Sequence, residues 1–231
     1  MKRLVICALL AGCGGGSIDL ADLGTAFGRA TCGKQFECCT DAEIMEQFMD
    51  VGFEGEPITT EEQCAGFFTA FYGELLIPQF QDSVAKGRIA YDGEALADCV
   101  AGIERLTCAE YGARDLGALP SSCDRFIIPW VADGGRCTYD HECISDHCVG
   151  ASSPPGGPST DGTCRPLPTA GQGCEIDCAD GLYCGLDPSL GWVCQAKQAD
   201  GMPCTVDLEC ASDHCDTTET CATKPLTCDG R

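Results

Sequence analysis

The residues of this chain that could do chemistry are 22 cysteines and three histidines among 231 residues. His147 and His214 each directly precede a cysteine, where the base of a cysteine–histidine nucleophile pair could lie. Such a pair needs a free thiolate, and in an oxidising compartment the neighbouring cysteine is bridged. These histidines and His141 all belong to a repeated sequence, which is typical of turn residues rather than catalytic groups. We therefore predict surface imidazoles that hydrogen-bond their own turns.

Metal and redox chemistry would need closely spaced thiols. Zinc ribbons and thioredoxin-like sites rely on Cys-x-x-Cys, and this spacing does not occur in the sequence. Adjacent Cys38 and Cys39 could form a vicinal redox switch. Neighbouring side chains on a helix diverge by about 100°, however, which favours two disulfides with separate partners. We predict neither a metal nor a cofactor.

Carboxylates recur in the repeated sequence and could together hold calcium. They are Asp133, Asp140, Glu142 and Asp146, with counterparts Asp200, Asp207, Glu209 and Asp213. The spacing of an EF-hand loop is absent, so a solvated acidic face is favoured and calcium is the alternative. Neither a phosphate-binding glycine loop nor a Gly-x-Ser-x-Gly elbow occurs, so nothing supports a hydrolase or a nucleotide-binding protein.

The composition indicates an exported protein. Lysine and arginine number 14 against 36 aspartates and glutamates, which gives a formal charge of −22. A chain this acidic repels phosphate backbones, which excludes nucleic acid as a partner. Cysteine makes up nearly a tenth of the residues, the composition of a disulfide scaffold in an oxidising compartment. The longest apolar run is too short to span a bilayer.

The N-terminus has the organisation of an export signal. A basic start and a seven-residue apolar core precede the small residues of Leu10-Ala11-Gly12-Cys13. This sequence resembles the lipobox of bacterial lipoproteins. In that family the cysteine receives a diacylglyceryl group and becomes the acylated N-terminus after cleavage. The resemblance implies that residues 1–12 are a signal peptide and that Cys13 is the lipid anchor.

An anchor at Cys13 would make a membrane one partner of the protein. Each buried CH₂ contributes about 0.8 kcal/mol, so two or three acyl chains bind stably. Residues 13–18 are glycine-rich and would form a flexible tether. Gly14 favours the outer membrane or cell surface, because an aspartate there resembles an inner-membrane retention signal. Residues 1–12 are short for a signal peptide. One alternative is therefore a missed upstream start, and another is a buried N-terminal strand with ordinary cysteines.

Cysteine parity agrees with the anchor. Removal of Cys7 with the signal and acylation of Cys13 would leave twenty of the 22 cysteines, an even number. We predict that these twenty form a disulfide scaffold whose connectivity cannot be read from spacing alone. They are Cys32, Cys38, Cys39, Cys64, Cys99, Cys108, Cys123, Cys137, Cys143, Cys148, Cys164, Cys174, Cys178, Cys184, Cys194, Cys204, Cys210, Cys215, Cys221 and Cys228.

Residues 19–131, which we call the helical part, have the apolar period of helices. Residues 59–62 fit a capping box for a helix that would end near Pro78. Asp92 could cap another helix, along which Cys99 faces the core.

Two further helices are indicated nearer the N-terminus. Leu20, Leu23, Phe27 and Phe36 predict a first helix, although Gly24, Gly28 and Gly33 weaken it by raising its entropy cost. Residues 41–50 predict a short second helix. We therefore expect a bundle of about four helices braced by disulfides.

An internal repeat follows Val131. The pattern Ala-Asp-Gly-x-x-Cys-Thr-x-Asp-x-Glu-Cys-x-Ser-Asp-His-Cys occurs at 132–148 and again at 199–215. A degenerate copy begins at Ala170, and each copy ends with a fourth cysteine. The repeat predicts three four-cysteine modules at about 132–166, 167–196 and 197–231, which we call the first, second and third cysteine segments.

The predicted fold class is small and disulfide-rich, an N-terminal disulfide-braced α-helical bundle followed by three short four-cysteine modules with little regular secondary structure. The modules contain too little apolar surface to offset chain entropy, so disulfides at about 2–4 kcal/mol each must stabilise them. Beyond Val131 only Cys228 is left over from the three sets of four cysteines, and the helical part holds seven cysteines, an odd number. Parity therefore predicts that Cys228 pairs with a cysteine of the helical part.

The spacing Cys-x5-Cys-x4-Cys with an Asp-x-Glu-Cys core resembles the first cysteine-rich region of Dickkopf-type secreted proteins. It is also similar to repeats in predicted cysteine-rich lipoproteins of Gram-negative bacteria, where a helical cysteine-containing segment precedes the repeats. The resemblance covers residues 132–221. Dickkopf receptor contacts lie largely in a second cysteine-rich region that has no match here, so that activity is not implied.

Three functional hypotheses follow. The first is a non-catalytic lipoprotein, anchored at the cell envelope or surface, that binds an envelope or extracellular protein or glycan. The second is a secreted protease inhibitor or toxin-like effector that presents residues 149–158 as a loop; a stiff spacer is the alternative for that segment. The third, an enzyme with its site in the helical part, has no supporting motif. We predict the first.

Overall fold

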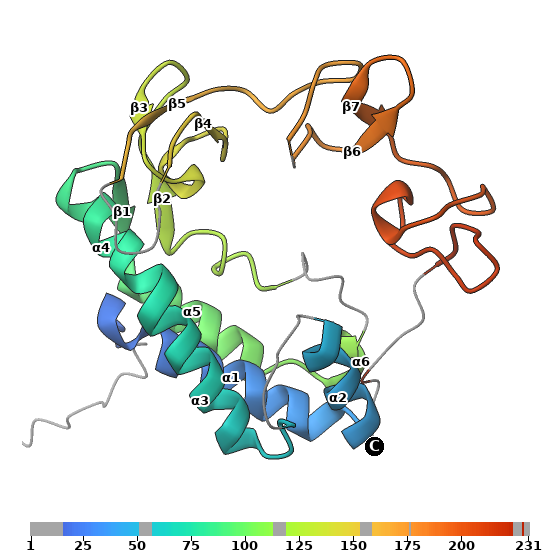
Figure 1. The fold of residues 1–231 in the computed structure, drawn as a ribbon. Helices are drawn as coiled ribbons and strands as arrows, with labels where there is room; N and C mark the ends of the chain where they lie inside the picture. The colour runs from blue at the N-terminus through green and yellow to red at the C-terminus, as the bar shows by residue number, and fades with distance from the viewer. Residues whose placement is uncertain are drawn as a thin grey trace, which may run out of the picture.

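The computed structural model describes residues 16–50, 57–112, 119–152, 159–175, 177–223 and 228. The helices of the N-terminal half lie together, and the disulfide-bonded segments that follow arch away from them (Figure 1). Near the C-terminus, Cys228 packs with Ile44 of α2 (Asp41–Asp50) and Cys108 of α6 (Cys108–Gly112). Within the described residues, none of the helices has the length and apolar character needed to cross a membrane.

The first helix, α1 (Leu23–Cys38), follows a 3-10 turn, η1 (Leu20–Asp22), and packs closely against α3 (Glu61–Phe71). Its glycines explain this approach. A Cβ on Gly28 would lie 2.7 Å from the Cβ of Phe68, and one on Gly24 would lie 2.7 Å from the Cβ of Tyr72. The glycines that weaken the helix locally therefore permit its packing, and both predicted helices before residue 51 are confirmed.

The third helix begins one residue later than the capping box predicted. Thr60 Oγ1 accepts a hydrogen bond from the backbone N–H of Gln63 at 3.2 Å, and Gln63 Oε1 accepts one from the N–H of Thr60 at 3.1 Å. The reciprocal partner is thus Gln63 rather than Glu62, because it occupies the third helical position.

The predicted helix end near Pro78 is wrong. A π-helical turn, η2 (Tyr72–Leu76), joins α3 to α4 (Ile77–Ala85), so the chain stays helical through the proline. Pro78 lies in the first turn of α4. The N–H of Ile77 bonds to the carbonyl oxygen of Tyr72, five residues earlier, so the π-helical turn carries the helix up to the proline.

Asp92 caps α5 (Gly93–Glu104) as predicted. Its Oδ1 accepts hydrogen bonds from the N–H groups of Glu94 at 3.0 Å and Ala95 at 2.9 Å. Leu96, Cys99 and Ile103 of this helix are buried against α1 and its neighbours. One face of α5 therefore completes the helical core.

Three small sheets follow or flank the helices. β1 (Ile89–Tyr91) pairs antiparallel with β2 (Ile127–Pro129), with Ala90 opposite Ile128. A second sheet has the order β3-β5-β4, formed by β3 (Arg136–Cys137), β5 (Gly162–Cys164) and β4 (Cys148–Val149). The third is the hairpin of β6 (Leu182–Asp187) and β7 (Gly191–Ala196).

The first and third cysteine segments attach to their preceding sheets in the same way. Two residues after β2, Val131 forms a parallel bridge with Cys143, and two residues after β7, Gln198 forms one with Cys210. The 3-10 turn η3 (Asp140–Glu142) contacts β2, and η4 (Asp207–Glu209) contacts β6. The sequence repeat therefore corresponds to a repeated packing arrangement.

The buried residues form separate clusters. One cluster of the helical part is purely apolar and contains Leu23, Ile77 and Leu96, whereas another combines Ala30 and Ile103 with Cys99 and Cys123. The buried clusters of the first and third cysteine segments consist of cysteines alone. Disulfides therefore take the place of an aliphatic core in these two segments.

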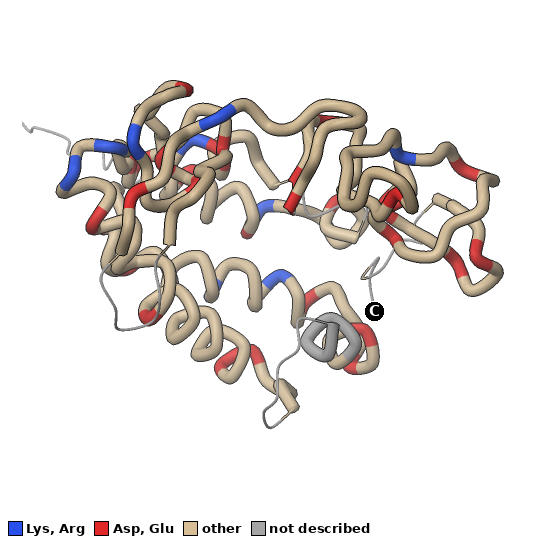
Figure 2. Tube along the Cα trace, turned by 45° about the horizontal axis from the view of Figure 1, so that its top comes forward, with Lys and Arg blue, Asp and Glu red and all other residues tan. Residues whose placement is uncertain are grey.

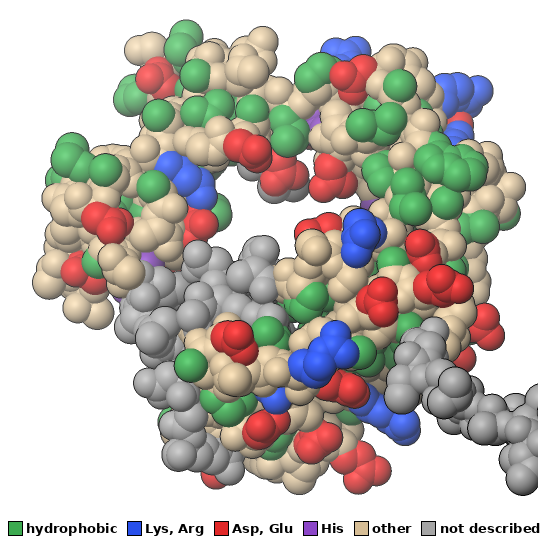
Figure 3. All heavy atoms as spheres, turned by 180° about the vertical axis from the view of Figure 1, so that it is seen from behind, with side chains coloured by type: hydrophobic (Ala, Val, Ile, Leu, Met, Phe, Trp, Pro, Cys, Tyr) green, Lys and Arg blue, Asp and Glu red, His purple; other side chains and the backbone are tan. Residues whose placement is uncertain are grey.

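Acidic residues are spread over the helices and the cysteine segments, and basic residues are fewer (Figure 2). The space-filling view shows an opening between the helical part and the cysteine segments (Figure 3). The segments thus form an arch that is joined to the helices at its beginning and at its end.

Candidate functional site

All twenty cysteines from Cys32 to Cys228 form disulfides. Four lie in or reach the helical part: Cys32–Cys64, Cys38–Cys108, Cys39–Cys228 and Cys99–Cys123. The others join first to third and second to fourth cysteine within each segment: Cys137–Cys148, Cys143–Cys164, Cys174–Cys184, Cys178–Cys194, Cys204–Cys215 and Cys210–Cys221. Clusters of three cysteine sulfurs occur in every segment, but no thiolate is left in them to bind a metal.

The adjacent cysteines at the end of α1 have separate partners, as helix geometry predicts. Cys38 pairs with Cys108, and Cys39 pairs with Cys228 across 189 residues. Glu43 adds a second link, since its Oε1 accepts the backbone N–H of Cys228 at 2.9 Å and this hydrogen bond lowers the pKa of the Glu43 carboxyl. The tail is therefore held to the helical part, as parity predicted.

The predicted lipid anchor, Cys13, lies outside the described residues, as do the other two residues of the first half of the tether, Gly14 and Gly15. Residues 149–158 belong partly to them. Ser152 and Thr160 exchange two backbone hydrogen bonds, of 3.1 and 2.8 Å, beside the pairing of β4 with β5. This segment therefore connects two strands of one sheet, so it is not a spacer between modules.

The repeated carboxylates cap backbone groups. Asp140 Oδ1 accepts the N–H of Cys148 at 2.6 Å, and Asp207 Oδ1 accepts the N–H of Cys215 at 2.6 Å. Glu142 and Glu209 accept the N–H groups of Thr138 and Thr205, each also at 2.6 Å. The Asp-x-Glu-Cys core is thus a structural device. A solvated acidic face was the wrong prediction for Glu142, which has no exposed surface.

Glu142 also holds the first cysteine segment to the helical part. Its Oε1 accepts the hydroxyl of Ser83 at 2.7 Å, and its Oε2 lies 3.1 Å from Arg88 Nη1. Arg88 Nη2 pairs with Asp161 at 3.0 Å. Hydrogen bonds from Arg88 and Thr138 lower the pKa of Asp161 to about 2, and the bond to Asp161 raises the pKa of Arg88.

His141 lies in the interface between the first cysteine segment and the helical part, and it is not a surface imidazole. Its ring packs edge-on against Phe80 with centroids 4.8 Å apart and stacks on Tyr139 at 5.2 Å. Burial lowers its pKa, against the opposing effect of the Glu142 and Asp140 charges. The prediction fails because α4, distant in sequence, covers this turn.

Ser83 Oγ lies 3.0 Å from His141 Nε2, the distance of a serine–histidine pair. The single hydroxyl proton of Ser83 is directed to Glu142, so the Nε2–H of His141 donates to Ser83. Ser83 is also fully buried. A nucleophile needs its proton removed by the base and access to substrate, and this serine has neither. The arrangement holds two parts of the chain together.

The other two histidines lie within their own segments. His147 Nδ1 is 3.3 Å from the carbonyl oxygen of Pro166, which agrees with the predicted use of the ring in local structure. The carbonyl oxygens of His147 and His214 accept equivalent backbone bonds, from Arg165 and Ala222 at 3.0 Å each. These histidines therefore occupy matching places in the repeat.

A cavity of about 450 Å³ lies beside the interface. Phe80 and Gln79 of α4 line one side, and His141, Asp140 and Asp146 line the other. Burial raises the pKa of Asp146, with added repulsion from Asp140 and Asp177. Among the described residues these carboxylates are not gathered closely enough to form a metal site.

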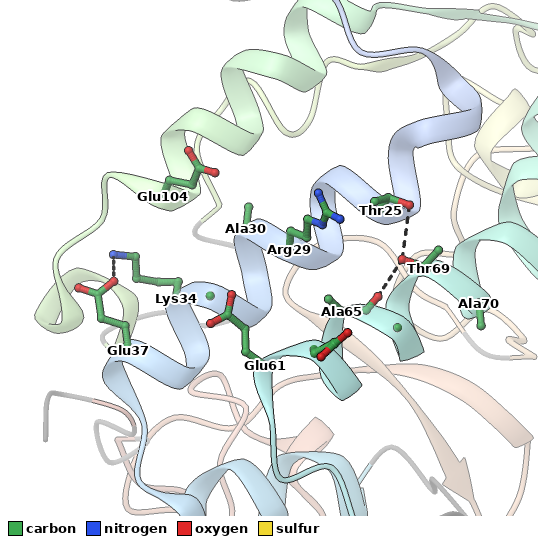
Figure 4. A pocket seen from close by; sticks show the side chains of 13 residues that line it. Thr25, Arg29, Ala30, Lys34, Glu37, Glu61, Ala65, Thr69, Ala70 and Glu104 are labelled. Carbon is green, nitrogen blue, oxygen red and sulfur yellow. Dashed lines mark hydrogen bonds and ion pairs between the residues drawn. The ribbon is translucent and has the colours of Figure 1, made fainter.

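A larger open groove, of about 1160 Å³, lies between α1 and α3 with α5 at one end (Figure 4). Small residues such as Gly33 and Gly66 form part of its lining, and Lys34 pairs with Glu37 at 2.6 Å. The other charged side chains, Arg29, Glu61 and Glu104, project from three different helices without converging (Figure 4). The groove contains no nucleophile with an adjacent base.

Exposed large hydrophobic side chains gather in and around the cysteine segments. Trp130 and Ile144 lie near the start of the first, and Leu186 and Trp192 face each other across the β6–β7 hairpin of the second. The third segment exposes Met202, Val206 and Leu208. The cysteine segments therefore carry much of the exposed apolar surface of the described residues.

Sequence reasoning missed Ser83, Arg88 and Asp161. Their contacts with Glu142 and with each other join residues at least 54 positions apart, and such contacts leave no local pattern in the sequence.

Comparison with known proteins finds no matching family model, no similar curated protein and no similar solved structure. The arguments for function therefore come from this chain alone.

Proposed function

We propose that the protein is a membrane-anchored, non-catalytic lipoprotein of the cell envelope or surface that uses a disulfide scaffold to bind another macromolecule, a protein or a glycan. The observation that carries the proposal is the pairing of all twenty cysteines beyond Cys13. Ten disulfides require an oxidising compartment. They also leave Cys13, in its lipobox-like sequence, free for acylation.

The distribution of polar groups supports a binding role. Glu142, Arg88, Asp161 and Ser83 bond to one another, and the repeated aspartates cap backbone groups. The groups that could do chemistry thus stabilise the fold. The three four-cysteine modules would present apolar side chains at the end of a tether formed by residues 13–18.

The anchor is tested by labelling cells with a radioactive fatty acid while they express the full chain. We expect the wild-type protein to be labelled and to fractionate with membranes, and Cys13→Ser to lose both properties. Cys7→Ser is the matched control, because this cysteine would leave with the signal peptide. Labelling that survives Cys13→Ser would overturn the proposal.

A protease inhibitor is a second candidate, favoured by one observation. The strand pair and the Ser152–Thr160 hydrogen bonds hold the base of the loop at 153–158, as inhibitory loops require. Replacement of residues 153–158 by glycine and serine leaves that base intact. Inhibition of a purified serine protease by the wild type and not by this variant would favour the inhibitor; equal activity of the protease in all samples would dismiss it.

A further inference from the structure

The first cysteine segment already binds a helix within this molecule. Tyr139 and His141 lie on either side of Asp140; Phe80 of α4 contacts the His141 ring, and Tyr139 stacks on the same ring. Phe80 of α4 packs against the His141 ring, and Ser83, one turn later, bonds to His141 and Glu142. Arg88, just beyond the helix, supplies the cation for the Glu142 carboxylate. We call the positions of Tyr139 and His141 in the repeat the helix-binding face.

The third cysteine segment has the same backbone conformation at the equivalent positions. Its turn η4 repeats η3, and the residues before the two turns have similar backbone angles, φ −133° and ψ 152° for Tyr139 and φ −143° and ψ 155° for Val206. Asp146 and Asp213, equivalent in the repeat, share a left-handed conformation with φ 51° and 48°. The disulfides and the carboxylate caps are also equivalent.

The face of the third segment is uncovered. Val206 and Leu208 occupy the positions of Tyr139 and His141 and are 51% and 65% exposed. The N–H of Lys197 bonds to the carbonyl of Gly181 at 3.0 Å, just as Trp130 bonds to Arg88 at 2.9 Å.

Gly181 therefore stands where Arg88 stands in the first copy, and it follows the disulfide-bonded stretch from Cys174 instead of a helix. In the part of the chain that the structure describes, no ion pair reaches Glu209.

We propose that the third cysteine segment binds an amphipathic helix of a partner protein, with an apolar side chain on Val206 and Leu208 and a basic residue after the helix that pairs with Glu209. The proposal names the kind of partner for the binding function above and rests on that function.

Charge and burial favour this occupant. Leu208 lies between Asp207 and Glu209, so insertion into lipid would bury two carboxylates that the described residues give no cation, which is costly. A second copy of this chain would have to offer its own α4. That surface is already used, because Phe80 is 9% exposed and Ser83 is fully buried.

The probe is a synthetic, end-blocked peptide with the sequence of residues 75–90, which contains Phe80, Ser83 and Arg88. It is titrated into the full chain, labelled with ¹⁵N and folded with its disulfides. We expect saturable binding below about 1 mM, with shifts of the amide signals of Val206 and Leu208 and not of those of Tyr139 and His141. A peptide with Arg88→Glu should bind about tenfold more weakly, because it places a second acid beside Glu209.

Leu208→Asp should weaken binding of the peptide at least about tenfold, since it puts a charge into an apolar contact. Ile144→Asp is the matched control, because Ile144 is also 65% exposed and lies in the first segment. This variant should bind like the wild type.

Absence of saturable binding by the wild type up to about 1 mM, or equal binding by Leu208→Asp, would overturn the inference. Acylation of Cys13 is measured separately, so the failure of this inference is distinguishable from failure of the proposed function.

Discussion

Arg88 Nη1 lies 3.1 Å from Glu142 Oε2, and the Glu142 side chain has no exposed surface. The two residues belong to different parts of the chain, the loop before β1 and the turn η3. A buried carboxylate is costly unless it is paired and hydrogen-bonded. The pair therefore sets how the first cysteine segment sits on the helical part.

Replacement of Arg88 by methionine should lower the free energy of unfolding by about 3 kcal/mol, because it leaves Glu142 buried without a cation. Urea denaturation with the disulfides intact measures the change. Arg136→Met is the control, because the exposed Arg136 pairs with Asp161, an acid that Arg88 also contacts, and its loss should cost less than about 0.5 kcal/mol. Equal effects of the two variants would refute the role of Arg88.

His141 should make stability depend on pH. Burial lowers its pKa in the folded protein, so the unfolded chain binds a proton that the folded state resists. The contribution of neutral His141 to the free energy of unfolding is complete above the pKa of the unfolded chain, about 6.5. It is lost as the pH falls below that value. Urea unfolding is followed by the fluorescence of Trp130 in a Trp192→Phe background. The urea concentration at the midpoint should decrease as the pH is lowered below this value, and His141→Gln should make that decrease smaller.

Asp161 provides a contrast at lower pH. Its pKa is lowered to about 2, so its contribution is present above the unfolded pKa of about 3.9 and is lost towards pH 2. Asp161→Asn should therefore change the pH dependence of stability only below about pH 4.

The two variants separate the two pH ranges. If His141→Gln left the pH dependence of stability near pH 6 unchanged, that dependence could not be assigned to His141.

Local patterns in the sequence predicted the elements that depend on local contacts. Capping by Asp92 and the helix at 41–50 follow from local spacing. The return of Cys228, across 189 residues, was predicted from the number of cysteines instead. The Arg88–Glu142 pair spans 54 residues and Arg88–Asp161 spans 73. Contacts between residues so far apart in sequence leave no local pattern. His141 was therefore predicted to lie on the surface, and the interface between the first cysteine segment and the helical part was missed.

The Cys39–Cys228 disulfide predicts a specific pattern of free thiols. Cys39→Ser/Cys228→Ser removes both partners and should leave no thiol to alkylate among residues 32–228 of the denatured, unreduced protein. Cys38→Ser/Cys228→Ser should leave two, Cys39 and Cys108, because each loses its partner. Mass spectrometry after alkylation counts them. The reverse result would show that Cys38 holds the tail.

Removal of this disulfide should also destabilise the protein. Loss of a native disulfide costs about 2–5 kcal/mol, and a long loop gains the most from closure in the chain-entropy account. The bond closes a separation of 189 residues. Urea denaturation of Cys39→Ser/Cys228→Ser, followed by circular dichroism of the helices, measures the loss. Unchanged stability would show that Glu43 and the other contacts suffice to hold the tail.

The packing of α1 on α3 can be tested by adding one methyl group. A Cβ at Gly28 would lie 2.7 Å from the Cβ of Phe68 and 3.3 Å from the carbonyl oxygen of Ala65, so the helices must separate. Gly28→Ala should lower the free energy of unfolding by about 1–3 kcal/mol. Gly66→Ala, in the open groove of α3, meets nothing within 4 Å and should raise it by about 0.5–1 kcal/mol. Opposite signs in urea denaturation would show that close approach, and not helix propensity, requires the glycine at position 28.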